Sequence, residues 1–396
     1  MAPAPPILTV NGGSSSIKFA LFSPADPPRR LLTGIIDRIG QPNTTLSATT
    51  ADDQRFAPTS LKADSHADAA RHLIAWLRDH AATPPAAIGH RVVHGGIHLT
   101  DHQLVTDDLL NELRATQPLD LAHLPREIAL IEAFRDLSPS IPQVACFDTA
   151  FFRDLPRVAQ LLPVPRKYLD AGVRRFGFHG LSYTYLMSAL RRLAPVEADG
   201  KVILAHLGSG ASMAAVHRGK PIDTTMAFTP TAGLVMGTRP GDLDPGLLVY
   251  LARVEKLAPD ELDEFISHQC GLLGVSATTP DMRDLQSRRH TDPRATEAID
   301  LFCYQCKKYI GAYAAALGGL DTLVFSGGIG EHSHETRAQI CDGLDYLGLN
   351  LDEQNNGSNA PVVSSPTSRV KVRIIPTDEE LIIAQATRKV VSSTSN

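Results

Sequence analysis

Two patterns of apolar residues alternate along the chain. Short apolar runs predict strands, and longer segments in which apolar residues recur every three to four positions predict helices. Residues Ile7–Val10 and Ile17–Phe22 predict a β-hairpin, and a further strand is expected near Leu31–Ile36. In Asp68–His80 the apolar positions, among them the single tryptophan Trp76, recur at the spacing of an amphipathic helix. This alternation is typical of an α/β protein.

The alternation continues to about residue 150. Gly89–Val93 predicts a strand that ends in two glycines, and helices are expected at 107–115 and 125–136. Another strand is expected at Gln143–Phe147, and Asp148 stands directly after it. The carboxyl ends of such strands are where α/β proteins place their ligands.

After a proline-rich connection the second half repeats this order. A polar stretch rich in proline and serine, 355–369, is expected to be a mobile loop. The other expected elements are strands Val202–His206 and Met213–Val216, helices through 245–268 and 294–317, strands Thr322–Ser326 and Val370–Ile375, and a last helix from about Asp378.

The length of 396 residues is too great for one ordinary core, so two domains are expected. We place the first at 1–150, joined by the C-terminal helix at about 378–396, and the second at 151–377. The repeated pattern predicts two equivalent α/β halves with ligands bound at strand ends in a central cleft.

Composition narrows the class of protein. The chain is 43% hydrophobic and 20% charged, with a net charge of −5 and no long basic run, which argues against a nucleic-acid partner. The start, MAPAPPILTV, lacks the basic and apolar regions of a signal peptide, and no window has the roughly 20 apolar residues of a membrane span. A cytoplasmic protein without membrane contact is expected.

Five cysteines do not form the pattern of a disulfide framework in a chain of this size. Cys303 and Cys306 form a lone CxxC on the apolar face of a predicted helix. We favour core packing over metal or redox chemistry for this pair.

Two glycine-rich turns occupy matching places in the two halves. The first runs Asn11-Gly12-Gly13-Ser14-Ser15-Ser16 with Lys18 nearby, and the second runs from His206 to Ser212 through Gly208-Ser209-Gly210. Backbone N–H groups, hydroxyls and an ammonium group suit phosphate oxygens. The alternative is a hairpin turn with ordinary turn residues.

A third glycine-rich turn, Ser326-Gly327-Gly328-Ile329-Gly330-Glu331-His332, follows a predicted strand and opens a helix. A glycine-rich helix N-terminus suits the binding of an anion or a nucleotide. The alternative is a turn that serves only tight packing. No Walker A motif is present, since Lys220 is followed by Pro221. ATP would therefore bind outside the P-loop class.

Two arginines, Arg91 in GHRVVHGG and Arg239 in MGTRPGD, lie between small residues at strand ends or turns. A guanidinium binds carboxylate or phosphoryl oxygens with two parallel hydrogen bonds and stays protonated. The alternative for each is an interdomain salt bridge.

Three further groups are candidates for chemistry. Asp148 follows a strand and could hold an arginine or a metal-bound water, or cap a helix. His179 could stabilise a transferred phosphoryl group, or be a structural histidine. Glu379 and Glu380 begin the last helix, where carboxylates are favoured in any case.

These motifs together resemble the acetate kinase family, within the actin, hexokinase and sugar-kinase superfamily. The resemblance covers nearly the whole chain and includes, in order, NGGSSSIKF, GHRVVHGG, FDTAFF, RRFGFHG, AHLGSGAS, DTTMAFTP, MGTRPGDLDPG, DMRDL, FSGGIGEHS and PTDEELIIA. It implies two duplicated actin/hexokinase-like (ribonuclease-H-like) domains around a nucleotide cleft.

The resemblance also implies roles. Arg91 and Arg239 would hold the acyl carboxylate and the phosphoryl group, Asp148 would be the catalytic carboxylate, and His179 would stabilise the transition state. Asn11 and Glu379 would organise Mg²⁺, largely through water. The remaining contacts would be Ser14, Ser16, Lys18 and the turn His206-Leu207-Gly208-Ser209-Gly210 for phosphates; Asp281, Met282, Arg283, Gly328, Ile329, Gly330, Glu331 and His332 for the nucleoside; Val93, Ala122, Phe178 and Pro230 for the acyl group; and His123 beside it.

The chain departs from the usual family pattern at a few positions. Ser209 replaces the asparagine of the usual GNG, and His332 replaces the asparagine at the end of the usual GIGEN. Gly180-Leu181-Ser182-Tyr183 stands where GTSH is usual. Ala122 stands where leucine is common, which could widen the acyl pocket enough for propionate.

The activity implied is reversible, Mg²⁺-dependent phosphoryl transfer between ATP and acetate, giving ADP and acetyl phosphate. Propionate or dual specificity is the nearest alternative, and a non-catalytic nucleotide switch is another. The family further implies a homodimer.

Overall fold

The computed structural model describes residues 5–13, 15–81, 83–121 and 123–394. The chain divides into two compact units: unit 1 comprises Met1–Ala150 and Asp378–Asn396, and unit 2 comprises Phe151–Thr377.

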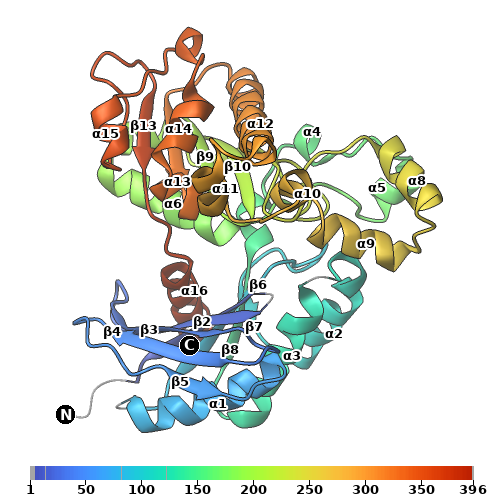
Figure 1. Ribbon diagram of the computed structural model, residues 1–396. Helices are drawn as coiled ribbons and strands as arrows, with labels where there is room; N and C mark the ends of the chain where they lie inside the picture. Colours follow the sequence, from blue (N-terminus) through green and yellow to red (C-terminus); the bar gives the residue numbers. More distant parts are fainter. Residues whose placement is uncertain (1–4, 14, 82, 122, 395–396) are drawn as a thin grey trace. The chain divides into compact units, whose positions relative to one another are not determined.

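Unit 1 is built on a mixed sheet (Figure 1). Its strands are β1 Ile7–Gly12, β2 Ser16–Phe22, β3 Arg30–Asp37, β4 Thr44–Thr50, β5 Thr59–Leu61, β6 Ala87–Val92, β7 Gln103–Leu104 and β8 Gln143–Phe147. They lie in the order β5-β4-β3-β2-β1-β6-β8-β7. β1, β2 and β3 are antiparallel neighbours, whereas β1, β6 and β8 run parallel. The carboxyl ends of these three parallel strands therefore meet at one edge.

Helices cover both faces of this sheet (Figure 1). They are α1 His66–His80, α2 Asp107–Thr116, α3 Leu124–Leu137 and α16 Glu379–Thr394, with 3-10 turns at Gln117–Leu119 and Asp148–Phe152. Leu8 packs in the cluster with α1 and α3, whereas its neighbour Ile7 packs against Ala384 of α16. Alternate residues of a strand face opposite sides, so β1 is buried on both faces from Ile7 to Asn11.

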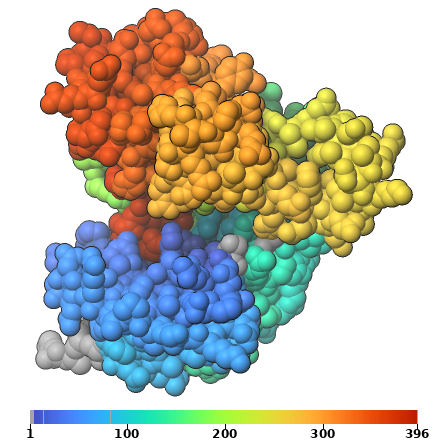
Figure 2. Space-filling model, in the orientation of Figure 1, coloured from blue at the N-terminus to red at the C-terminus, as the bar shows by residue number. Residues whose placement is uncertain are grey.

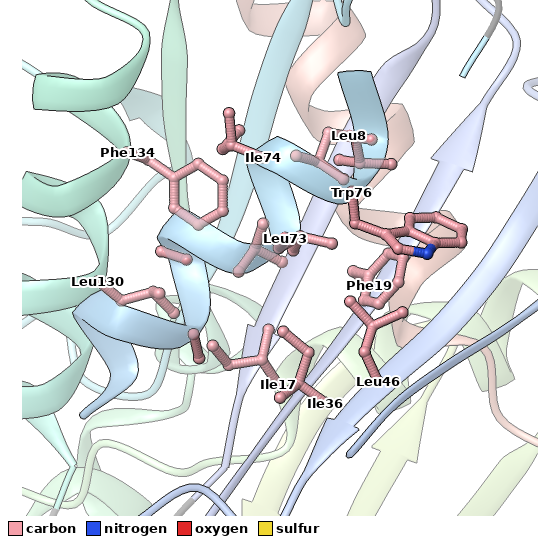
Figure 3. Close-up of a cluster of buried hydrophobic side chains, with 14 of the residues drawn as sticks. Leu8, Ile17, Phe19, Ile36, Leu46, Leu73, Ile74, Trp76, Leu130 and Phe134 are labelled. Atoms are coloured by element: carbon pink, nitrogen blue, oxygen red, sulfur yellow. The ribbon is translucent and has the colours of Figure 1, made fainter. Parts of the chain in front are cut away.

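The core between the sheet and α1 is mostly aliphatic and includes the rings of Phe19, Trp76 and Phe134 (Figure 3). Phe19 of β2 meets Trp76 of α1 edge to face at 6.2 Å between ring centroids. Ser65 caps α1 by accepting the Asp68 N–H at 3.1 Å. This cap and the apolar stripe fix α1 against the strands that carry the first glycine-rich turn.

Unit 2 repeats the arrangement with fewer strands. These are β9 Lys201–Leu207, β10 Ala211–His217, β11 Lys220–Thr224, β12 Thr322–Ser326 and β13 Lys371–Ile374, in the order β11-β10-β9-β12-β13. β9, β10 and β11 are antiparallel neighbours, whereas β9, β12 and β13 are parallel. Directions and order match β3-β2-β1-β6-β8 of unit 1, so the expected duplication is present.

Helices of unit 2 pack on both faces of its sheet. The helices are α4 Arg157–Gln160, α5 Arg166–Asp170, α6 Gly180–Leu193, α7 Pro195–Ala198, α8 Pro245–Val254, α9 Pro259–His268, α10 Gly271–Ser276, α11 Met282–Arg288, α12 Pro293–Leu317, α13 Gly327–His332, α14 His334–Cys341 and α15 Glu353–Gly357, with a 3-10 turn at Asp345–Leu347. α6 shares a cluster with Val202 and Leu204 of β9, and α12 also contacts β9, β10 and β11. Cys303 and Cys306 of α12 are buried, as core packing requires.

One sequence-based expectation is wrong in detail and another is confirmed. The helices expected through 245–268 are α8 and α9, which separate where Lys256 adopts a left-handed φ of 56° and Pro259 starts a new helix. This segment (yellow) lies at the surface of unit 2 (Figure 2). The stretch 355–369, expected to be a loop, begins within α15, and Val362 and Ser364 pair with other segments as isolated bridges.

No helix within the described residues is both long and apolar enough to span a bilayer.

Candidate functional site

In unit 1 the first glycine-rich turn joins β1 to β2. Asn11 and Lys18 face each other across this hairpin, and the Gly13 N–H donates to the Ser16 carbonyl at 2.7 Å. His66 of α1 lies with Nε2 2.8 Å from the Gly13 carbonyl oxygen. Asn11 is buried and Lys18 is exposed, so the turn presents an ammonium group beside a fixed amide. Ser14 lies outside the described residues.

The parallel strands β6 and β8 bring Arg91 and Asp148 together. Arg91 pairs in register with Cys146, two residues before Asp148. Its Nε and Nη2 donate to Asp148 Oδ2 at 3.1 and 2.6 Å, and Asp148 is fully buried. Burial opposes the guanidinium charge, but the carboxylates of Asp148 and Glu379 outweigh it and raise the pKa of Arg91.

Asn11 and Glu379 complete this arrangement. Arg91 Nη1 donates to Asn11 Oδ1 at 3.3 Å, and Asn11 Nδ2 donates to Glu379 Oε2 at 3.0 Å. Glu379 Oε2 also lies 3.9 Å from Arg91 Nε. Of the two glutamates that begin α16, Glu379 is therefore the one that contacts Asn11 and Arg91. Burial raises the pKa of the other, Glu380, and the negative charge of Glu379 adds to that shift.

The residues expected around an acyl group fall in both units. In unit 1, Val93 is buried just beyond β6, and His123 Nδ1 lies 2.8 Å from Asp120 Oδ1. In unit 2, Phe178 and Pro230 are buried. Ala122 lies outside the described residues.

In unit 2 a hydroxyl network orients two histidines. His179 is the residue before α6 and adopts a left-handed φ of 59°, with Nδ1 2.8 Å from Ser212 Oγ. The His206 ring is tilted by 31° against the His179 ring with 4.4 Å between the ring centroids, and its Nδ1 lies 2.8 Å from Ser182 Oγ. Tyr183 also hydrogen-bonds Ser212, so both imidazoles are held by buried side chains.

Arg239 and His179 converge on the second glycine-rich turn. A Cβ atom placed on Gly210 would lie 2.8 Å from Arg239 Nη2 and 3.4 Å from His179 Nε2. Arg239 Nη1 donates to the Pro230 carbonyl at 2.6 Å. The turn thus lies directly against a guanidinium and an imidazole.

The turn at 206–210 also lies against α13. A Cβ on Gly327, whose φ is +76°, would lie 2.7 Å from the Leu207 carbonyl oxygen, so only glycine allows this approach. Gly237 donates its N–H to the Ser209 carbonyl at 2.9 Å. Gly328 is exposed, and a Cβ there would meet nothing within 4 Å, so the start of α13 is open to a ligand.

Some expected nucleoside contacts are engaged elsewhere. Glu331 Oε1 accepts the Gly327 N–H at 2.8 Å and so holds the turn. Asp281 caps α11 and accepts two side-chain hydrogen bonds from the highly exposed Arg283, whereas Met282 is buried. Ile329 is partly buried, Gly330 is buried, and His332 is exposed.

Sequence reasoning missed several residues. Ser212 and Tyr183 lie within the quoted motifs, but nothing local marks them as partners of His179. Glu127 of α3 was missed altogether, although its Oε2 accepts the Val93 N–H at 3.0 Å. A carboxylate on an apolar helix face is the signal that could have found it.

The family model described as the Acetokinase family matches residues 6–385. The chain belongs to this family. It is 44% identical over 386 residues to the acetate kinase of Nitrobacter hamburgensis, covering 96% of this chain and 95% of the relative.

Members of the family with solved structures share the fold. The acetate kinase of Porphyromonas gingivalis superposes with a TM-score of 0.87 at 35% identity, covering 98% of this chain and all of that one. A propionate kinase of Francisella tularensis gives a TM-score of 0.91 at 34% identity with the same coverage. The α/β fold class predicted from the sequence is confirmed.

Proposed function

We propose that this chain catalyses the reversible transfer of the γ-phosphoryl group of ATP to acetate, giving ADP and acetyl phosphate. Membership of the acetokinase family along nearly the whole chain supports the reaction class. The observation that carries the assignment is the Arg91 guanidinium, fixed at the end of β6 by the buried Asp148.

The chemistry needs charge neutralisation more than a base. Acetate is already an anion, so the obstacle is its repulsion from the phosphate chain. A guanidinium whose orientation is set by Asp148 and Asn11 loses little freedom on binding a carboxylate or phosphoryl group. Asp148 would thus act as the catalytic carboxylate chiefly by orienting Arg91.

Residues of unit 2 serve the same reaction. Arg239 and His179 would stabilise negative charge on the transferred group, since both lie against the Gly210 turn. Ser16, Lys18 and the turn 206–210 would contact phosphates, and Gly328 at the open start of α13 would lie beside the nucleotide. The two compact units would then be the two functional domains.

Mg²⁺ fits the oxygen donors of unit 1. Asn11 and Glu379 each carry a hard oxygen of the kind Mg²⁺ prefers, although here Asn11 Nδ2 faces Glu379 Oε2 and Asn11 Oδ1 accepts from Arg91. The described residues hold no group of three or more His, Cys, Asp or Glu side chains for a metal. Such sparse protein ligation matches an ion held largely by water and phosphate, where it would supply further neutralisation.

Acetate and propionate differ by one methylene in the acyl pocket. Each buried methylene contributes about 0.8 kcal/mol, so a pocket of Val93, Phe178 and Pro230 would discriminate only modestly. The similar propionate kinase structure favours dual specificity as the second candidate. An assay in which acetate and propionate compete distinguishes acetate specificity from dual specificity.

A cytoplasmic homodimer is also proposed from the family. Helix α8 supports association, because Leu247, Val249, Tyr250 and Val254 are each 40–59% exposed and it buries no residue. Light scattering of the purified chain tests the dimer.

Trapping acyl phosphate with hydroxylamine tests the activity. The native chain with ATP, Mg²⁺ and acetate should form acetyl hydroxamate, whereas a non-catalytic nucleotide switch should form none. Arg239→Ala should lower turnover by about 10²–10⁵, by analogy with arginine fingers. Near-native turnover of that variant would refute the role of Arg239.

A further inference from the structure

A buried carboxyl group beside Arg91 has no role in the reaction described so far. Glu127 of α3 is only 5% exposed. Its Oε2 accepts the Val93 N–H at 3.0 Å, and its Oε1 has no hydrogen-bond partner among the described residues. Carboxyl groups are rarely buried without a specific partner, so this position needs an explanation.

The hydrogen bond to Val93 lies where β6 leaves the sheet. β6 pairs with β8 as far as Val92, and Val93 is the first residue beyond the strand. Farther on, the Gly95 N–H donates to Thr149 Oγ1 rather than to a strand. Glu127 therefore binds the first backbone N–H beyond the ladder, two residues after Arg91, and fixes the direction of the chain there.

The electrostatic surroundings favour a neutral acid at this position. Burial, followed by the nearby Asp120 charge, raises the pKa of Glu127 to about 8, although Arg91 opposes the shift. Asp120 on the preceding turn is held by His123, and Asp148 adds a further negative charge. A protonated carboxyl accepts the Val93 N–H without adding a negative charge near Arg91.

Glu127 also lies under the first glycine-rich turn. It lines a small cavity of about 10 Å³ together with Gly12, Gly13, His66 and Arg126. Leu130, one turn along α3, contacts the same turn, since a Cβ on Gly12 would lie 3.3 Å from Leu130 Cδ2. α3 thus supports both the end of β6 and the β1–β2 turn.

We propose that Glu127 is a positioning residue for phosphoryl transfer: its side chain fixes Val93 at the end of β6 and thereby aligns the Arg91 guanidinium. This inference rests on the proposed function. The action is indirect, because Glu127 reaches the reacting groups only through the backbone at Val93 and the charge of Arg91.

Two near-isosteric variants isolate the hydrogen bond. Glu127→Gln keeps an oxygen acceptor for the Val93 N–H, whereas Glu127→Met fills similar space without an acceptor. We expect Glu127→Met to lower kcat about 10- to 100-fold with the KM for ATP changed less than twofold, since misplacement by about 1 Å can cost that much. Glu127→Gln should keep kcat within about threefold.

A matched control comes from the same helix. Glu132→Ala removes an exposed carboxylate of α3 that pairs with Arg114, and it should leave kcat unchanged. A double-mutant cycle with Arg91→Lys tests the route: the Glu127→Met effect should shrink when the guanidinium is absent. Full additivity of the two changes would overturn the proposal.

The outcomes separate this proposal from the proposed function. If the native chain forms no acyl phosphate, the proposed function fails. If the native chain is active and folded Glu127→Met keeps its kcat, only the positioning role fails. If Glu127→Met does not fold, the pH profile decides: above about pH 8 the native rate should fall and the Glu127→Gln rate should not, and superimposed profiles would overturn the proposal.

Discussion

Replacing Gly210 by alanine places a methyl group against the two charged side chains of unit 2. The new Cβ would lie 2.8 Å from Arg239 Nη2 and 3.4 Å from His179 Nε2. Ordinary contacts begin near 3.4 Å, so the guanidinium must move by about 0.6 Å. Its Nη1 is anchored to the Pro230 carbonyl at 2.6 Å, so the movement strains that hydrogen bond as well.

The expected result is a loss of turnover without a loss of fold. Gly210 lies outside the left-handed region, so its backbone accepts alanine. Because misplacement by about 1 Å can cost about 10²-fold in rate, a 0.6 Å shift should lower kcat by about 10-fold or more. That corresponds to about 1.4 kcal/mol or more in the activation free energy. Hydroxylamine trapping measures kcat, and circular dichroism confirms folding.

Two glycines of the same unit serve as controls. A Cβ on Gly357 of α15 or on Gly328 of α13 would meet nothing within 4 Å. Gly357→Ala should be indistinguishable from the native chain, and Gly328→Ala should alter mainly the KM for ATP if α13 faces the nucleotide. A native kcat for folded Gly210→Ala, or an equal loss for Gly357→Ala, would contradict the placement of Arg239.

Three further outcomes are expected. Burial raises the pKa of Glu127 from 4.5 to about 8. Between these pH values the folded chain keeps a proton that the unfolded chain has lost. The free energy of unfolding therefore falls as pH rises from 4.5 to about 8, by up to about 1.4 kcal/mol per pH unit. Glu127→Gln should therefore gain in Tm over the native chain between pH 5 and about pH 8 and no further above it; parallel Tm curves would contradict the buried neutral acid. Asn356→Ala should lower the free energy of unfolding by about 1.5–3 kcal/mol in urea titrations, because the fully buried Arg337 loses the acceptor that Asn356 Oδ1 offers at 2.8 Å; a change below about 0.5 kcal/mol would show that another acceptor replaces it. EDTA should abolish acyl phosphate formation reversibly while leaving Tm unchanged, because the proposed Mg²⁺ is held largely by water and phosphate; a large fall in Tm would reveal a structural ion instead.

Local patterns were sufficient where a single segment carries the signal. The strand Gln143–Phe147 and the helix at 107–115 lie within one residue of the observed elements, because their periodicity is confined to one run of chain. The prediction was wrong where it depended on composition alone. The stretch 355–369 has the composition of a loop, but its first residues belong to α15.

The sequence by itself determined the repeated succession of strands and helices, the two glycine-rich turns and the position of Arg91 at a strand end. These features depend on neighbouring residues, whose sterics and hydrophobic period act along one segment. Only the tertiary structure decided that Asp148 and Asn11 orient Arg91, that Ser212 holds His179, and that Glu127 binds the backbone at Val93. Each of these hydrogen bonds joins residues more than 30 positions apart, and such a contact leaves no local mark because packing of whole helices and strands brings its partners together.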